Sequence, residues 1–148
     1  MEEMNDNKNL KEFMLKEIDL IQDIIKRMAS NSFMIKGWTI TLVVATLLLK
    51  RSKFQMFIAF IPLIAFWFLD SYFLWQERLY RKLYDWVIDN RLNTKELLFS
   101  MNANRFKGQV QSKVKIMFSE TLGWFYGSIF VVVLIYLAAL LLIKRGGC

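Results

Sequence analysis

Residues Thr121 to Ile143 form a run of 23 residues without a charged side chain. A helix needs about 20 mostly apolar residues to cross the hydrocarbon core of a bilayer. Trp124 and Tyr126 near its start have the character of membrane-interface residues. The run therefore predicts a transmembrane helix. With a single Pro, six Gly and 55% hydrophobic residues, the rest of the chain also favours helices over a turn-rich β fold.

Two other apolar runs predict two further spans. The first extends from Phe33 to Leu49, 17 residues with one internal charge at Lys36. The second covers residues 54–75, with Pro62 near its middle, where a proline removes a backbone hydrogen bond and predicts a kink. Helical apolar spacing continues past Gln76 to about Asn90, so this helix is expected to project from the bilayer.

The first 30 residues have the pattern of an amphipathic helix. Their apolar stripe consists of Leu10, Met14, Ile18, Ile21, Ile25 and Met28. Asn31 and Ser32 separate this helix from the first span. We therefore expect an all-α membrane protein with an N-terminal amphipathic helix and three transmembrane helices, the second extended into the cytoplasm.

This pattern divides the chain into four parts. Residues 1–30 are the amphipathic cytoplasmic helix, 31–75 a transmembrane hairpin, 76–120 a basic cytoplasmic helical segment, and 121–148 the third span and tail. Within the third of these, Asn93 and Thr94 resemble a helix N-cap and predict a short helix over 97–101.

Three spans place the N-terminus and residues 76–120 on one side of the membrane, with 14 of the 20 Lys and Arg residues. The positive-inside rule then assigns this side to the cytoplasm of a bacterial inner membrane. The basic loop at 50–53 opposes this assignment, because it would also favour the cytoplasm.

Composition argues against an enzyme. The chain has no His, and its one Cys is Cys148. Ser–His and Cys–His nucleophile pairs and ordinary zinc sites are thereby excluded, and we expect no catalytic residue, metal or cofactor. No role is predicted for Cys148.

Lys36 and Asp70 are charges inside predicted spans, where ionisable groups are costly and usually face a partner or water. In antiparallel helices joined at 50–53, both residues lie at roughly 20–26 Å from the loop. They are candidates for an intramembrane ion pair. The alternative is that Lys36 extends to the headgroups and that Asp70 pairs with Arg78 or lies at the interface.

The first span also carries a stripe of pore-lining candidates on one helical face: Lys36, Thr39, Val43 and Thr46. Three spans are too few to enclose a pore, so conduction would require a homo-oligomer. The alternative is that the Thr hydroxyls bond to carbonyls of their own helix.

Two further groups of residues are candidates for binding. Gly123, Gly127 and Ser128 form a small-residue face suited to close helix packing, within the chain or between chains. Arg105, Lys107, Lys113 and Lys115 are candidates for contacting ligand phosphates. The same basic stretch is also suited to anionic lipids of the inner leaflet.

Residues 27–43 and 66–85 together resemble a family of small bacterial membrane proteins, the membrane effectors of Hailong-type anti-phage defence systems. The resemblance is most specific from Trp67 to Asp85. It implies a homo-oligomeric channel, a tetramer by analogy, whose partner is a nucleotidyltransferase. It also implies that DNA oligomers made by that partner hold the channel shut and that an N-terminal helix is the trigger.

Two functions follow from these observations. The first is an oligomeric inner-membrane channel effector, gated by the cytoplasmic segments, that depolarises the membrane. The second is a non-conducting membrane scaffold or anchor that recruits a soluble partner.

Overall fold

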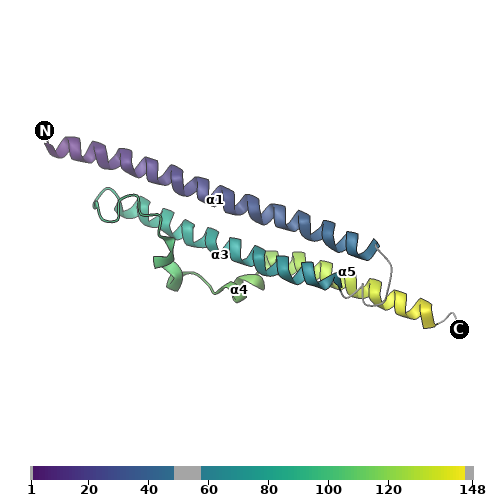
Figure 1. Ribbon diagram of the computed structural model, residues 1–148. Coiled ribbons are helices and arrows are strands. Elements are labelled where there is room, and N and C mark those ends of the chain that lie inside the picture. The colour runs from purple at the N-terminus through teal and green to yellow at the C-terminus, as the bar shows by residue number, and fades with distance from the viewer. Residues whose placement is uncertain (1, 49–57, 146–148) are drawn as a thin grey trace. The chain divides into compact units, whose positions relative to one another are not determined.

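The computed structural model describes residues 2–48 and 58–145, and all regular structure in these residues is helical. Two long helices, α1 (Glu2–Leu48) and α3 (Phe60–Asn90), precede a 3₁₀ helix, η1 (Ala103–Gln109). The short α4 (Lys113–Met117) and the long α5 (Glu120–Arg145) follow (Figure 1). The expected loop at 50–53, residues 54–57 of the expected second span, and Cys148 lie outside the described residues.

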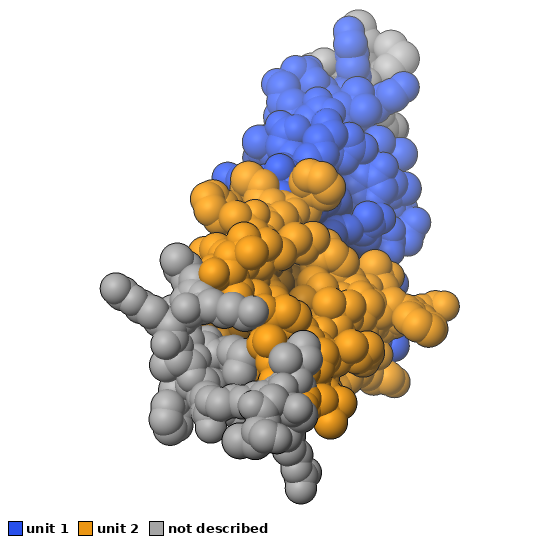
Figure 2. Space-filling view, turned by 90° about the vertical axis from the view of Figure 1, so that its right-hand side faces the viewer, with its two compact units in different colours: residues 1–31, 73–112 blue, residues 32–72, 113–148 orange. Residues whose placement is uncertain are grey.

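The described residues form two compact units, coloured separately in Figure 2. Unit 1 comprises residues 1–31 and 73–112, and unit 2 comprises 32–72 and 113–148. Both α1 and α3 therefore contribute one part to each unit. The short α4 belongs to unit 2 together with α5.

Helix α1 continues through Asn31 and Ser32, where the sequence led us to expect a break. Serine side chains often compete for the backbone hydrogen bonds of a helix. The Ser32 hydroxyl instead donates to Asp70 and accepts from Lys36 Nζ at 2.8 Å. Because the side chain is occupied by these contacts, it does not interrupt the helix. The continuous helix has 47 residues, a length of about 70 Å at 1.5 Å per residue.

Pro62 lies in the first turn of α3 rather than in the middle of a helix. A proline is tolerated there, because the first backbone N–H groups of a helix have no intrahelical partner. The expected kink within α3 is therefore not needed. The helix ends at Asn90, the end that its apolar spacing indicated.

The short helix expected over 97–101 is absent from this described segment, which consists of turns. Leu97 and Phe99 have φ values of 54° and 56°, in the left-handed region that side chains other than Gly rarely adopt. Two such residues in three positions are incompatible with a right-handed helix.

Leu97→Gly is expected to stabilise unit 1 by about 0.5–1 kcal/mol, because glycine adopts the left-handed conformation without steric cost. The Leu97 side chain is 54% exposed, so little packing is lost. Phe99→Gly is the matched control, since it also removes the edge-to-face contact of Phe99 with Phe13. Equilibrium unfolding in mild detergent should show a gain only for Leu97→Gly, and a loss there would contradict the strain argument.

Two of the described helices are long and apolar enough to cross a membrane: residues 8–48 of α1 and 120–140 of α5. Only 22% of the apolar window of α5 is buried within the chain, whereas the core helix of a soluble protein is mostly buried. Among the described residues α3 does not meet the same criterion, because Asp70 and the polar residues from Gln76 onward interrupt its apolar run.

Candidate functional site

Asp70 is the centre of a polar cluster inside unit 2. Its carboxylate is fully buried and lies 2.6 Å from Lys36 Nζ. It also accepts hydrogen bonds from the hydroxyls of Ser32 and Tyr126, the latter at 3.0 Å. The cluster therefore joins α1, α3 and α5, and every oxygen of the buried carboxylate has a donor.

Aromatic packing holds this cluster in position. Trp67, one turn before Asp70, stacks on the Tyr126 ring with a centroid distance of 5.7 Å. Its indole N–H donates to the carbonyl of Met117 at 2.8 Å, which ties α3 to the end of α4. Together with the Tyr126 hydroxyl, these contacts fix the Asp70 side of the ion pair to three segments of unit 2.

The outer surface of unit 2 is strongly apolar. Large exposed side chains on its helices include Phe33, Trp38, Ile61, Trp124, Val132 and Ile135, each at least 60% exposed. Exposed apolar area of this extent marks a membrane or protein contact surface. Unit 2 thus has a charged pair inside and apolar side chains outside, the reverse of a soluble domain.

The stripe of pore-lining candidates is mostly covered within the chain. Thr39 is fully buried and Val43 is 3% exposed, whereas Ile40 and Val44 are exposed. The Thr39 and Thr46 hydroxyls donate to the carbonyls of Ile35 and Leu42, four residues earlier. The middle of this stripe therefore faces its own unit, whereas Lys36 and Thr46 are half-buried, and a water-facing wall in an oligomer stays a prediction.

The small residues of α5 are differently placed. An added Cβ at Gly127 would meet no atom within 4 Å, while one at Gly123 would only touch the backbone of Phe118 at 3.9 Å. Ser128 is exposed, and its hydroxyl donates to the carbonyl of Phe125. Gly127 and Ser128 therefore lie on a face of α5 that the chain itself leaves open.

The four phosphate candidates all have contacts within the chain. Arg105 lies over the Trp86 ring at 4.1 Å, Lys107 over Trp75 at 6.0 Å and Lys113 over Tyr72 at 4.9 Å. Lys115 also has an interaction partner. Cation–π contacts of this kind stabilise the fold. Arg105 and Lys107 belong to unit 1, and Lys113 and Lys115 belong to unit 2.

Arg105 is the most constrained of these four cations. Its Nε and Nη2 atoms are buried and have no hydrogen-bond partner among the described residues. Burial lowers the pKa of the guanidinium, with the nearby Arg91 charge adding to this effect and Glu17 opposing it. Arg105 therefore acts chiefly through its stacking on Trp86.

A buried ion pair in unit 1 was missed by the sequence reasoning. Glu17 of α1 and Arg91 after α3 are each about 1% exposed, and Arg91 Nε lies 2.5 Å from Glu17 Oε2. Arg91 also donates to the carbonyls of Thr94 and Glu96, at 3.1 and 2.8 Å. Glu17 accepts from the backbone N–H of Phe99 at 2.5 Å.

These contacts fasten α1 to the turn segment that follows α3. They also account for the left-handed residues in that segment, since the network holds the backbone on both sides of them. We refer to Glu17, Arg91 and the backbone of 94–99 as the latch. In the sequence, the only sign of this ion pair is that Arg91 does not fit the apolar spacing of the helix before it.

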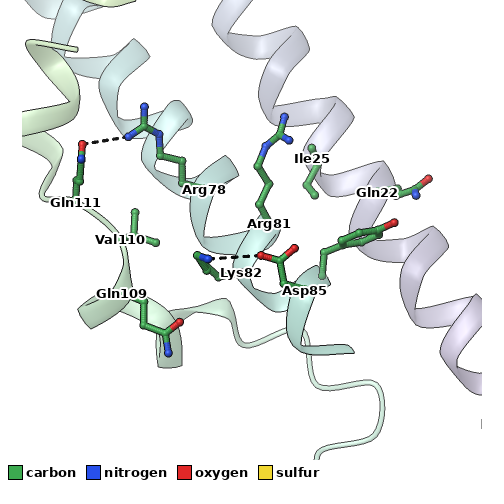
Figure 3. A pocket seen from close by; sticks show the side chains of 10 residues that line it. Gln22, Ile25, Arg78, Arg81, Lys82, Asp85, Gln109, Val110 and Gln111 are labelled. Atoms are coloured by element: carbon green, nitrogen blue, oxygen red, sulfur yellow. Dashed lines mark hydrogen bonds and ion pairs between the residues drawn. The ribbon is translucent and has the colours of Figure 1, made fainter. Parts of the chain in front are cut away.

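A basic cleft of about 690 Å³ lies elsewhere in unit 1 (Figure 3). Its cations are Arg78 and, one turn later on α3, Arg81 and Lys82. Three carboxamides also line it: Gln22 from α1, and Gln109 and Gln111 from the end of η1 and the segment after it. Sequence reasoning treated Arg78 only as a partner for Asp70 and did not single out the cleft.

No family model matches the chain, and neither a curated protein nor a solved structure is similar to it.

Proposed function

We propose that this chain is a multi-pass protein of the bacterial inner membrane, with three transmembrane helices and a cytoplasmic N-terminus. Several copies assemble into a channel that depolarises the membrane in anti-phage defence. The cytoplasmic segments gate it, and a nucleotide or DNA-oligomer ligand made by a partner nucleotidyltransferase holds it closed. The defence role, the tetramer and this ligand derive from the family resemblance.

The observation that supports this proposal best is the ion pair between the half-buried Lys36 and the fully buried Asp70, within a unit whose outer surface is apolar. Ionisable residues in a bilayer are expensive and usually mark a functional element, paired with one another inside the bundle. The pair connects two helices that each begin or end in unit 1. A change in unit 1 therefore has a covalent path along α1 and α3 to the ion pair.

Burial of Thr39 and Val43 moves the proposed pore wall to α5, where Gly127 and Ser128 are open to contact with water or another chain. After Cys148 is replaced, a cysteine at Ser128 should react with a charged, water-soluble thiol reagent in the assembled channel. Cysteines at Thr39 and Val43 should be protected. Reaction at 39 and 43 with protection at 128 would return the wall to the first span.

Ion flux into liposomes that contain the purified chain tests conduction itself. Asp70→Asn should alter the flux, because it removes the charge that holds Lys36, while Glu120→Gln, an exposed carboxylate at the start of α5, should not. No flux from any preparation that is inserted and oligomeric would contradict the channel.

The second function, a non-conducting anchor that recruits a soluble partner, is favoured by one observation. The polar stripe of the first span is turned into its own unit rather than toward a passage. On this account the inserted protein passes no ions under any condition, and the flux measurement separates the two functions.

A further inference from the structure

The basic cleft of unit 1 concentrates positive charge on one face of α3. Arg78, Arg81 and Lys82 are spaced by three and one residues, so their side chains share one side of the helix. Asp85 is the one carboxylate in the lining, and it lies 3.5 Å from Lys82. Three cations and one carboxylate leave the lining with a net charge of +2.

The pairing of these cations leaves Arg78 available. Arg81 donates to Glu77 at 2.7 and 2.9 Å, so this exposed guanidinium is already paired with a carboxylate that is only 11% exposed. Arg78 donates at 3.3 Å to the carboxamide of Gln111, an uncharged partner. A guanidinium held by one long hydrogen bond to an amide retains donors for an anion.

Three carboxamides from other segments add polar groups to the lining of the cleft. Gln22, Gln109 and Gln111 each offer an amide donor and a carbonyl acceptor. Arginine forks bind the oxygens of phosphate in pairs, and lysine adds a point charge. The volume of about 690 Å³ is in the range of small-molecule sites rather than that of a bare ion.

We propose that this cleft binds a phosphate ester, with the phosphate on Arg78, Arg81 and Lys82 and the remainder of the ligand on the carboxamides. Two sources offer this chemistry: a soluble phosphorylated molecule and the headgroup of a phospholipid. A phospholipid headgroup is a candidate source because Arg78 lies only six residues after Tyr72, the last residue of α3 in unit 2. Six residues correspond to about 9 Å of helix. Only the headgroup source depends on the proposed membrane insertion, and neither source depends on conduction.

Binding is measured on the full chain in phosphatidylcholine nanodiscs, with glycerol 3-phosphate as the soluble probe and succinate as a non-phosphate dianion. The headgroup source is measured by native mass spectrometry of lipids retained from nanodiscs that also contain phosphatidylglycerol. Arg78→Gln and the double variant Arg78→Gln/Arg81→Gln remove the cations. Arg27→Gln is the matched control, an exposed arginine of α1 that does not line the cleft.

The wild type should bind glycerol 3-phosphate or retain phosphatidylglycerol, and these two outcomes identify the source. Arg78→Gln should lower the affinity for whichever probe the wild type binds by about tenfold or more, because one charge-assisted hydrogen bond is lost. Arg27→Gln should leave this affinity unchanged. Circular dichroism verifies that the variants remain folded. Binding of neither phosphate probe, equal binding of succinate, or equal loss in Arg27→Gln would each overturn the proposal.

Discussion

Arg91→Met is expected to lower the free energy of unfolding by about 3–5 kcal/mol, the usual result of removing one member of a buried ion pair. The substitution leaves the Glu17 carboxylate buried with the Phe99 N–H as its remaining donor. It also removes the donor that satisfies the carbonyls of Thr94 and Glu96. Equilibrium unfolding of the full chain in mild detergent measures the loss.

Two further variants make this prediction specific. Lys16→Gln, which breaks the exposed pair with Glu12, should leave the unfolding curve unchanged. The double variant Glu17→Leu/Arg91→Met should be more stable than Arg91→Met alone, because no unpaired charge then remains buried. If Arg91→Met and Lys16→Gln have equal effects, the latch does not stabilise unit 1.

Asp70→Ala is expected to have an effect of similar size, about 3–5 kcal/mol, because it leaves Lys36 without its counter-charge inside unit 2. The hydroxyls of Ser32 and Tyr126 lose their acceptor in the same step. Oligomer assembly on gel filtration and equilibrium unfolding in detergent measure the result.

The exchanged pair Lys36→Asp/Asp70→Lys should recover part of this loss. Ser32 and Tyr126 can accept as well as donate hydrogen bonds, so they tolerate either charge at position 70. Full stability of both single variants, without any gain in the exchanged pair, would mean that the two charges act independently.

The resemblance to Hailong-type effectors and the cleft of unit 1 lead to separate experiments. In these proposals conduction depends on unit 2 in a membrane, whereas phosphate binding depends on residues of unit 1. A chain that binds phosphate esters without passing ions would favour the anchor function. A chain that conducts without binding phosphate esters would support the channel function and contradict the cleft proposal.

The sequence alone determined the features that depend on local periodicity. The uncharged run of 121–143 predicted α5, and apolar spacing predicted the end of α3 at Asn90. Equal distances from the 50–53 loop suggested that Lys36 and Asp70 are neighbours, and their charged atoms lie 2.6 Å apart. Because a helix rises by a constant distance per residue, the residue number gives the position along the helix axis. Such features can therefore be inferred before any packing is known.

Tertiary packing decided which helical face meets which partner. Periodicity placed Thr39 and Val43 on one face, but only packing shows that this face is turned inward. It likewise brought together Glu17 and Arg91, 74 residues apart, and stacked Arg105 on Trp86. A pattern along one helix defines which residues share a face and how far along the helix they lie. Contacts between distant segments depend on how several such faces fit together, and no single segment encodes that fit.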